Sequence, residues 1–517
     1  MTVAEYAALC SKKTSTFHYT CSKSKEKRER KRKNTNEFPE THAAIAVTTY
    51  LSYSVLILIG HIRDFLRKLG LMKHGKSAVK DDVFKLESDF SHFYTRNLYT
   101  RVRDCWNRPI ASAPSAYMDV MDRYSDDYNL TFKYPGTTSK VLNLGSYNYL
   151  GFAESGGPCV EDVVQRIKDD GVSSSSSRKD LGTTVLLKEL EALTARFVGK
   201  DDAMVFGMGF ATNSGNIPSL MGKGCLILSD ECNHTSLVLG ARLSGSIIRK
   251  FKHNDMDYLE KELRKAIIGG QPRTHRPWKR IFILVEGIYS MEGTILKLPE
   301  VVELKKKYKA YLYVDEAHSI GALGPTGRGV CDYYGVDPSE VDILMGTFTK
   351  SFGSAGGYVA ASHEIINFLR HTSYGATYAT SMPPPVTQMV FSAMKIVMGE
   401  DGTNEGKRRI NALAENCGYV RLKLKEKGFV LYGNDHSPVI PLLLYHPGRV
   451  TTFSRECLRR KLGVVVVGYP ATPIVEGRAR ICISAAHTRE MLDKALKEID
   501  SVGDILRVKY NKTYKWL

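Results

Sequence analysis

A lysine flanked by hydroxyl residues carries the strongest chemical signal in this chain. Lys350 lies in the run Met345–Gly353, which reads Met-Gly-Thr-Phe-Thr-Lys-Ser-Phe-Gly and follows an apolar, strand-like stretch over Val341–Met345. A lysine amine becomes a covalent catalyst when it forms a Schiff base with a carbonyl, and the usual protein-bound carbonyl is pyridoxal phosphate. The hydroxyls of Thr347 and Thr349 are suited to binding the cofactor's phosphate. The run therefore predicts a Schiff-base lysine beside a phosphate site.

An acidic residue follows another predicted strand earlier in the chain. Tyr311–Val314 favours a β-strand, and the charged helical stretch Val301–Lys309 precedes it. The strand delivers Asp315 at its carboxyl end. A fixed carboxylate keeps the pyridine nitrogen of the cofactor protonated, because a nearby opposite charge favours the charged form. We expect Asp315 to make this contact, and His318 to reach the phenolic oxygen of the ring from the same turn.

A histidine follows a third predicted strand. The run Cys225–Asp230 is largely apolar and ends in an acid, and His234 comes four residues later. An imidazole at this place could lie flat on the pyridine ring, and the alternative is a hydrogen-bonded turn residue. In open α/β sheets, ligands bind outside the carboxyl ends of the strands. We therefore expect the strand ends at Asp230–His234, Asp315–His318 and Thr347–Lys350 to meet around one cofactor.

A glycine-rich loop supplies a candidate phosphate cradle. Phe206–Gly215 reads Phe-Gly-Met-Gly-Phe-Ala-Thr-Asn-Ser-Gly and precedes a predicted helix. Backbone N–H groups at the start of a helix bind anions. We expect this loop to lie under the cofactor's phosphate, together with the threonines beside Lys350.

Five motifs, in this order, resemble the α-oxoamine synthases, which are pyridoxal-phosphate enzymes of aminotransferase fold type I. They are Ser-Tyr-Asn-Tyr-Leu-Gly (146–151), Asp-x-x-x-His (230–234), Asp-Glu-Ala-His (315–318), Thr-Phe-Thr-Lys (347–350) and Ala-Ala-His-Thr (485–488). Longer motifs at 285–293, 321–329 and 464–473 are similar to the catalytic, lysine-bearing subunit of the eukaryotic members that make long-chain bases. The similarity runs from about Ser91 to Val508.

The resemblance implies a role for each matching residue. Lys350 binds the cofactor covalently and moves the substrate's Cα proton, Asp315 pairs with the ring nitrogen, and His318 contacts the phenolic oxygen. His234 stacks on the ring. The implied contacts to the phosphate are made by Gly209, Phe210, Thr347 and Thr349, and by Thr380 across a dimer interface. The implied contacts to the substrates are made by Tyr147, Asn148 and Arg480.

The resemblance also implies an activity. L-serine would condense with a long-chain acyl-CoA such as palmitoyl-CoA, giving 3-ketosphinganine, CoA and CO2. The implied partners are a second, lysine-less subunit in a heterodimer and a small activating membrane subunit. Sibling synthases that make 5-aminolevulinate, 8-amino-7-oxononanoate or 2-amino-3-ketobutyrate are an alternative, and so is a non-catalytic scaffold subunit. A scaffold subunit lacks the Schiff-base lysine, whereas Lys350 is present.

Two positions depart from the family pattern. Gly468 stands where soluble bacterial relatives carry an arginine, two residues before the run Pro470–Pro473. Leu187 stands where the family usually has a histidine. We therefore expect another residue to bind the serine carboxylate, with Arg480 as the candidate. At Leu187 we expect the loss of one contact, either to acyl-CoA or at an interface.

The length and the alternation of elements predict the architecture. A chain of 517 residues exceeds one ordinary domain, and strand-like runs alternate with charged helical stretches through its middle third. We expect an α/β protein of fold type I, with a large, mostly parallel-sheet domain at 146–375 and a smaller C-terminal α+β domain at 376–517. The predicted segments before them are a basic tail at 1–40, a membrane helix at 41–62 and an amphipathic linker and N-terminal segment at 63–145. Ten cysteines without paired or metal-ligand spacing predict reduced thiols and no metal site.

The front of the chain is apolar and basic. Thr41–Ile62 contains no Asp, Glu, Lys or Arg and is long enough to span a bilayer, although its Thr and Ser content also suits a helix lying in the interface. Residues 1–80 hold sixteen Lys and Arg against six Asp and Glu, so +10 of the net charge of +18 falls there. The dense block Lys23–Lys33 suits a solvated tail, and no nucleic-acid recognition motif accompanies it. Acyl-CoA chemistry places the catalytic part in the cytosol, and the resemblance implies the endoplasmic reticulum membrane.

A nucleotide-binding pattern offers a rival interpretation. Gly70–Ser77 fits the phosphate-loop pattern, and Asp315–His318 spells a helicase-like acidic box, which together suggest a P-loop ATPase. A phosphate loop follows a buried strand. Gly70 instead follows His61–Leu69, which has the pattern of an amphipathic helix, so the synthase is the favoured interpretation.

Overall fold

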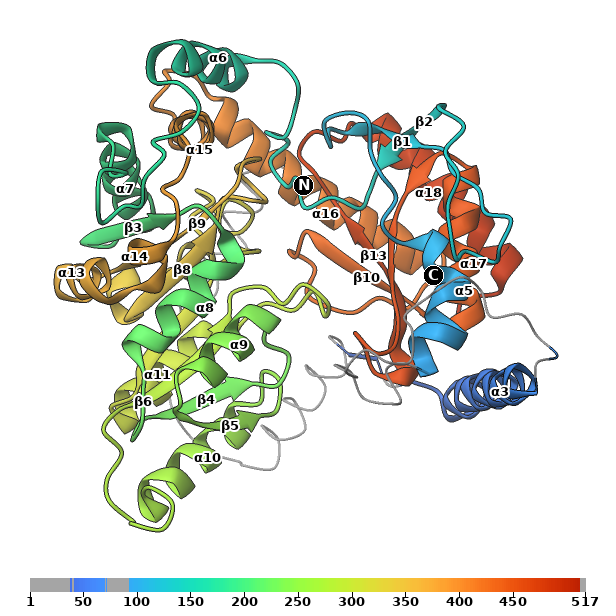
Figure 1. Ribbon diagram of the computed structural model, residues 1–517, viewed down its shortest axis with the longest axis horizontal. Helices are drawn as coiled ribbons and strands as arrows, with labels where there is room; N and C mark the ends of the chain where they lie inside the picture. Colours follow the sequence, from blue (N-terminus) through green and yellow to red (C-terminus); the bar gives the residue numbers. More distant parts are fainter. Residues whose placement is uncertain (1–37, 40, 70, 72–92, 512–517) are drawn as a thin grey trace. The chain divides into compact units, whose positions relative to one another are not determined.

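The computed structural model describes residues 38–39, 41–69, 71 and 93–511 (Figure 1). The chain divides into two compact units, Met1–Glu40 and Thr41–Leu517. The basic block Lys23–Lys33 and the phosphate-loop pattern, apart from Leu71, lie outside the described residues. All elements discussed below belong to the second unit.

A seven-stranded sheet forms the centre of the second unit. β4 to β8 are parallel, and β9 runs antiparallel to both of its neighbours, β8 and β3. The order across the sheet is β3 (Asp202–Phe206), β9 (Gly357–Ala361), β8 (Ile343–Thr347), β7 (Tyr311–Asp315), β6 (Ile281–Glu286), β4 (Leu226–Asp230) and β5 (Ile247–Phe251). This mostly parallel sheet confirms the predicted α/β architecture of fold type I.

Helices cover both faces of the large sheet, because alternate residues of each strand point to opposite sides. Met204 and Met345 pack with α8 (Gly209–Leu220), α9 (Thr235–Leu243) and α13 (His363–Thr372) on one face. On the other face, Val205 and Leu344 pack in the cluster that contains α7 (Val185–Val198), α10 (Met256–Gly269) and α11 (Leu298–Tyr308). A sheet buried on both faces is rigid, so it fixes the positions of the residues at its strand ends.

The carboxyl ends of four parallel strands all carry polar residues. Asp230, Glu286, Asp315 and Thr347 are the last residues of β4, β6, β7 and β8. Glu286 and Asp315 are directly paired in register on neighbouring strands. Parallel strands therefore place these four side chains along one edge of the sheet.

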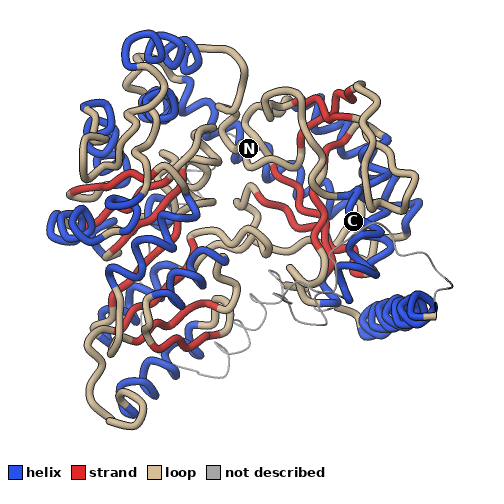
Figure 2. The backbone as a smooth tube through the Cα atoms, in the orientation of Figure 1, coloured by secondary structure: helices blue, strands red, loops and turns tan. Residues whose placement is uncertain are grey.

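Two smaller sheets belong to the remaining part of this unit. β10 (Val439–Tyr445), β13 (Gly477–Cys482) and β12 (Val465–Val467) are antiparallel, and β2 (Thr138–Asn143) pairs with β1 (Tyr117–Met121) and β11 (Leu462–Gly463). Figure 2 shows these strands among the surrounding helices. The helices are α6 (Pro158–Asp170), α15 (Pro384–Met398), α16 (Glu405–Glu426), α17 (Pro447–Arg459) and α18 (Arg489–Leu506).

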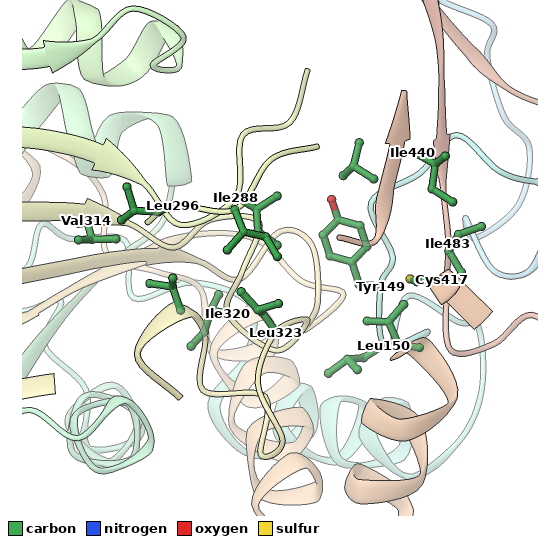
Figure 3. Close-up of a cluster of buried hydrophobic side chains, with 14 of the residues drawn as sticks. Tyr149, Leu150, Ile288, Leu296, Val314, Ile320, Leu323, Cys417, Ile440 and Ile483 are labelled. Carbon is green, nitrogen blue, oxygen red and sulfur yellow. The ribbon is translucent and has the colours of Figure 1, made fainter. Parts of the chain in front are cut away.

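One apolar core continues from the large sheet to the small sheets. Figure 3 shows Leu296 and Val314 of the large-sheet region and Ile440 and Ile483 beside the small sheet. Tyr149, which is fully buried, belongs to the same cluster. The loop that contains Tyr149 is therefore held between the two sheets, where the predicted substrate motif lies.

An apolar helix lies at the front of the second unit. α3 (Ala43–Lys68) is long and apolar enough to cross a membrane. One of its faces packs on the protein: Thr49 Oγ1 lies 3.3 Å from His446 Nδ1, and Asp64 forms a 2.6 Å ion pair with Arg96. Its other side exposes large apolar residues: Val47, Tyr50, Leu51, Val55, Leu58, Ile59, Ile62 and Phe65.

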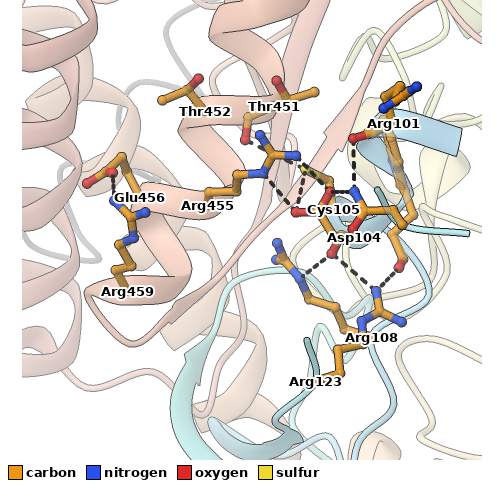
Figure 4. A network of polar contacts seen from close by, with 12 residues as sticks. Arg101, Asp104, Cys105, Arg108, Arg123, Thr451, Thr452, Arg455, Glu456 and Arg459 are labelled. Carbon is orange, nitrogen blue, oxygen red and sulfur yellow. Dashed lines mark hydrogen bonds and ion pairs between the residues drawn. The ribbon is translucent and has the colours of Figure 1, made fainter. Parts of the chain in front are cut away.

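Polar contacts attach the segment after α3 to α17. Figure 4 shows Asp104, whose carboxylate accepts two hydrogen bonds of 2.8 Å from Arg455 of α17. The carbonyl of Asp104 accepts from Arg108 and Arg123 at 3.1 Å each. This network fixes the segment that leads from α3 to the substrate motif.

Candidate active site

Lys350 follows the end of β8 by three residues and lies beside an aromatic ring. Its Nζ is 5.7 Å from the ring centroid of Tyr147. Burial lowers the pKa of Lys350 to about 8, and the carboxylates of Asp315 and Glu286 oppose that shift. A lysine with this pKa has a substantial fraction of neutral amine near neutral pH, which is the form that attacks a carbonyl.

Asp315 is buried and held in one orientation. Its Oδ2 accepts a 2.7 Å hydrogen bond from Asn213 Nδ2, and its Oδ1 accepts from the Ala317 amide at 2.9 Å. Asn213 is itself fixed, because its Oδ1 accepts from the Tyr313 hydroxyl at 2.8 Å and its Nδ2 also lies 3.0 Å from Ser236 Oγ. These contacts hold the buried carboxyl group of Asp315 rigidly at the end of β7.

His318 is buried and neutral. Its Nδ1 forms a 2.8 Å hydrogen bond with the Tyr149 hydroxyl, and its ring lies edge-on to Tyr147 with centroids 4.8 Å apart. Burial lowers the pKa of His318 well below its usual value, and the nearby Lys350 acts in the same direction. The imidazole therefore offers one nitrogen to a ligand while Tyr149 fixes the other.

His234 precedes α9 and has an exposed side chain. Its Nδ1 lies 2.8 Å from Ser236 Oγ and accepts from the Ser236 amide, so the imidazole caps the helix. Its backbone amide donates to the carboxyl of Glu286. Burial raises the pKa of Glu286 well above its usual value, and the neighbouring Asp315 adds to that shift. His234 is thereby fixed at both backbone and side chain, with an accessible ring.

The predicted phosphate-binding loop is shorter in the structure than in the sequence analysis. α8 begins at Gly209, so much of the predicted loop is helix, and Thr347 Oγ1 lies 2.7 Å from Thr349 Oγ1. A Cβ at Gly209 would lie only 2.6 Å from Thr347 Oγ1. Only glycine permits this approach of the helix start to the threonines. The start of α8 at Gly209 and Phe210 therefore lies against the two threonines, where the sequence analysis expects a phosphate.

A buried arginine faces the same aromatic ring. The guanidinium carbon of Arg480 lies 4.4 Å from the Tyr147 ring centroid. Among the described residues, Arg480 Nε has no hydrogen-bond partner. A buried donor without a partner is costly, so Arg480 is suited to a ligand carboxylate. Tyr147 thus joins Lys350, His318 and Arg480 in one site.

Asn148 and Thr380 occupy different surroundings. Asn148 is buried, and its side chain donates to the carbonyls of Pro114 and Ala153 and accepts from the Ala153 amide. It therefore shapes the loop that carries Tyr147.

Thr380 is exposed and forms an isolated antiparallel bridge with Ser177. An exposed position is consistent with a contact to another subunit.

The structure shows the surroundings of the two departures from the family pattern. Leu187 is fully buried in α7, where it is part of the apolar core. A Cβ on Gly468 would have Tyr53 Oη of α3 as a neighbour, at 4.0 Å. Gly468 therefore lies near the apolar N-terminal helix.

Two residues that organise the site carry no role in the sequence analysis. Asn213 orients Asp315, and Glu286 holds the His234 backbone while lying in register with Asp315. Asn213 follows Gly209 by one helical turn, which is a usable signal once α8 is known to start there. Glu286 ends an apolar strand, as Asp315 does, and could be found by the same pattern.

One group of possible metal ligands occurs in the described part of the chain. Asp230, Cys232 and His253 offer ligand atoms within 4.8 Å of one another. Both ring nitrogens of His253 have partners, Asp230 Oδ1 at 2.9 Å and Thr294 Oγ1 at 2.8 Å. The group is a hydrogen-bonded chain that supports the end of β4.

The fold and this site define a class of protein. A family model described as aminotransferase class I and II matches residues 139–499. The matched region holds the seven-stranded sheet and every site residue described above. The chain belongs to this family of pyridoxal-phosphate enzymes.

Within that class, the similarity is to one group. The chain is 55% identical to Serine palmitoyltransferase 3 of Homo sapiens over 482 residues, which are 92% of this chain and 87% of the relative. It is 54% identical to Long chain base biosynthesis protein 2d of Oryza sativa subsp. japonica over 90% of this chain and 95% of the relative. These identities place the chain among the serine palmitoyltransferases and long chain base biosynthesis proteins.

Solved structures agree with this placement. Serine palmitoyltransferase of Sphingomonas wittichii superposes with a TM-score of 0.72 at 28% identity, covering 82% of this chain and all of the relative. A high-resolution structure of a serine palmitoyltransferase with pyridoxal phosphate superposes with a TM-score of 0.70 at 26% identity and the same coverage.

Proposed function

We propose that this chain is the catalytic, lysine-bearing subunit of a serine C-palmitoyltransferase. It joins L-serine to palmitoyl-CoA and releases CoA and CO2, which gives 3-ketosphinganine, in the first step of sphingolipid biosynthesis. The observation that carries the proposal is the convergence of Lys350, His318 and Arg480 around Tyr147, in a chain 55% identical to a serine palmitoyltransferase. The carboxylate of Asp315 lies near enough to Lys350 to act on its pKa. A lysine-less scaffold subunit could not supply this convergence.

The residues present fit pyridoxal phosphate. The start of α8 at Gly209 lies against Thr347, so its backbone amides and the Thr349 hydroxyl are donors suited to a phosphate. The Thr347 hydroxyl donates to the Gly356 carbonyl at 2.9 Å and would have to turn to reach the phosphate. Asp315 would hold the pyridine nitrogen, and His318 the phenolic oxygen. When bound, the cofactor withdraws electrons from the substrate's Cα and so stabilises negative charge on it.

The chain's own groups perform the proton transfers and the positioning. Lys350, with its pKa near 8, takes the proton from the Cα of serine and later returns it. With the cofactor bound, Asp315 would keep the ring nitrogen charged, and the exposed imidazole of His234 would be available to stack on the ring. Arg480 binds the serine carboxylate through its unpaired Nε until that group leaves as CO2.

Helix α3 attaches the catalytic unit to a membrane, which we propose is that of the endoplasmic reticulum with the catalytic part in the cytosol. The exposed apolar side of α3 supports membrane contact. Its other side carries Thr49 and Asp64, which are paired with the catalytic unit. This packing favours a helix that lies along the membrane surface over one that leaves the protein to span the bilayer.

The working enzyme is a heterodimer with a lysine-less subunit, assisted by a small activating membrane subunit. The exposed Thr380 supports this, because it has the sequence context of a residue that reaches a phosphate across a dimer interface. Purification of the tagged chain with its partners tests the assembly. A preparation that contains only this chain and is fully active would contradict it.

A substrate panel tests the activity. The purified complex is assayed with serine, alanine and glycine against palmitoyl-, shorter acyl- and succinyl-CoA, and products are identified by mass spectrometry. We expect 3-ketosphinganine from serine and palmitoyl-CoA, and none from a Lys350→Ala complex. Product only from glycine with a short acyl-CoA would instead identify a sibling synthase.

A further inference from the structure

Two arginines lie on one face of the central strand of the small sheet. Arg478 and Arg480 are two residues apart on β13, so their side chains point the same way. Both are buried, and Arg478 has no exposed surface. A buried guanidinium is costly unless its donors are paired, so the partners of Arg478 indicate what it does.

Arg478 binds a turn of the large domain. Its Nη1 donates to the Met291 carbonyl at 2.7 Å and lies 3.8 Å from a Glu292 carboxylate oxygen. Its Nε and Nη2 donate to the carbonyl and the carboxylate of Glu476, at 2.9 and 2.6 Å. The guanidinium group of Arg478 thus joins β13 to the turn that follows β6.

The same turn touches Arg480. The sulfur of Met291 lies 4.0 Å from Arg480 Nη1, while the carbonyl of Met291 is held by Arg478. Packing leaves this turn little room, because a Cβ on Gly293 would lie 2.7 Å from the Val439 carbonyl of β10. A shift of the turn would therefore reach Arg480 through Met291.

We propose that Arg478 is a positioning residue: by holding the Met291 turn against β13, it sets where the guanidinium of Arg480 lies over Tyr147. The proposal rests on the proposed function, in which Arg480 binds the serine carboxylate. Arg478 itself touches no substrate. Replacing Arg478 would weaken the binding of serine and leave the binding of acyl-CoA unchanged.

A double-mutant cycle tests this assignment in the purified complex. Serine binding is measured by the change it causes in the cofactor's visible absorption, and KM is measured for serine and for palmitoyl-CoA. We expect Arg478→Met to raise the Kd and KM for serine by about tenfold and to change the KM for palmitoyl-CoA by less than about twofold. In an Arg480→Met background, Arg478→Met should not change the affinity for serine further, because both substitutions remove the same contact to the serine carboxylate.

Two further variants separate positioning from folding. Arg421, another fully buried arginine, donates to the carbonyls of Tyr432 and Val439, so Arg421→Met should lower the melting temperature without a selective effect on serine. Arg478→Lys keeps the charge, folds more readily than the Met variant and should recover part of the serine affinity.

Equal losses for both substrates, or additive losses in the Arg480→Met background, would overturn the positioning role. Failure of the wild-type complex to condense serine with palmitoyl-CoA would instead overturn the proposed function. In that case the serine titration still reports on Arg478 and Arg480, so the two failures are distinguishable.

Discussion

At the scale of residues, the site depends on a buried anion held by an amide. Asp315 accepts from Asn213, which in turn accepts from Tyr313. A hydrogen bond to a charged group contributes about 1.5–3 kcal/mol. Asn213 therefore matters although it has no reactive group, because it fixes the orientation of the carboxylate that we propose pairs with the cofactor's ring nitrogen.

Replacing Asn213 should impair turnover more than cofactor binding. We expect Asn213→Ala to lower kcat by about tenfold to a hundredfold, in line with the loss of one such bond. Asp315→Asn should retain some cofactor and lose more activity. The control is Asn216→Ala, a buried asparagine of the same helix whose side chain donates to the Thr212 carbonyl. Equal loss in both asparagine variants would contradict the role of Asn213.

The acidity of Lys350 gives a pH prediction. Its pKa is lowered to about 8, so the amine is mostly protonated below that pH and mostly neutral above it. The rate at which the cofactor-free protein binds pyridoxal phosphate covalently should rise with pH, with its midpoint near pH 8. Stopped-flow absorbance across pH 6 to about 10 measures this rate. A midpoint near that of an ordinary lysine would contradict the burial of the amine.

At the scale of elements, the start of α8 must approach β8 closely. The 2.6 Å distance from a Cβ on Gly209 to Thr347 Oγ1 means that any side chain there displaces the helix start or the threonine. That displacement would open the phosphate cradle without emptying the core.

Gly209→Ala should therefore weaken cofactor binding by about tenfold or more, equivalent to ~1.4 kcal/mol. Equilibrium dialysis with pyridoxal phosphate measures the Kd. Gly418→Ala in α16 is the matched control, since a Cβ there has no described neighbour within 4 Å. It should leave the Kd unchanged and be neutral or slightly stabilising. Unaltered cofactor affinity in Gly209→Ala would show that the cradle lies elsewhere.

Sequence patterns predicted the strands of the site but not every helix boundary. The strands before Asp230, Asp315 and Thr347 follow from short apolar runs that end in polar residues, and all three are found in the structure. The sequence analysis places the whole run Phe206–Gly215 before a helix, and this boundary is wrong because α8 already begins at Gly209. A glycine-rich run is typical of a loop, and only the tertiary approach to Thr347 explains the glycine.

The contacts between distant segments could not be predicted. Tyr147 meets Arg480 across more than three hundred residues of sequence, and Arg478 binds the turn that follows β6. No local pattern encodes such pairs, since they depend on how two sheets pack. For the same reason Asn213, which is unremarkable in sequence, was missed.

At the scale of the whole molecule, α3 is the feature that supports a membrane contact. Among the described residues it is the one helix long and apolar enough to cross a membrane, and its exposed side carries large apolar side chains. Burying such surface in lipid is favourable by about 25 cal/mol per Å². The catalytic unit should therefore bind membranes through α3, close to where its lipid product is released.

Placing charge on that side should release the protein. We expect the double variant Leu58→Glu, Ile62→Glu to lose most vesicle binding in flotation assays while folding normally, because both side chains are exposed. Ile268→Glu, which changes an exposed apolar residue at the end of α10, is the control and should float like the wild type. Vesicle binding that survives both changes on α3 would assign the membrane contact to another surface.

The central claim is that one lysine carries the cofactor. Borohydride reduction of the purified complex, followed by protease digestion and mass spectrometry, fixes pyridoxal phosphate to the amine that bonds it and identifies that residue. The account predicts a single modified peptide, containing Lys350, and none in a Lys350→Ala complex. A modified lysine elsewhere in this chain or in a partner subunit, or no modification at all, would contradict it.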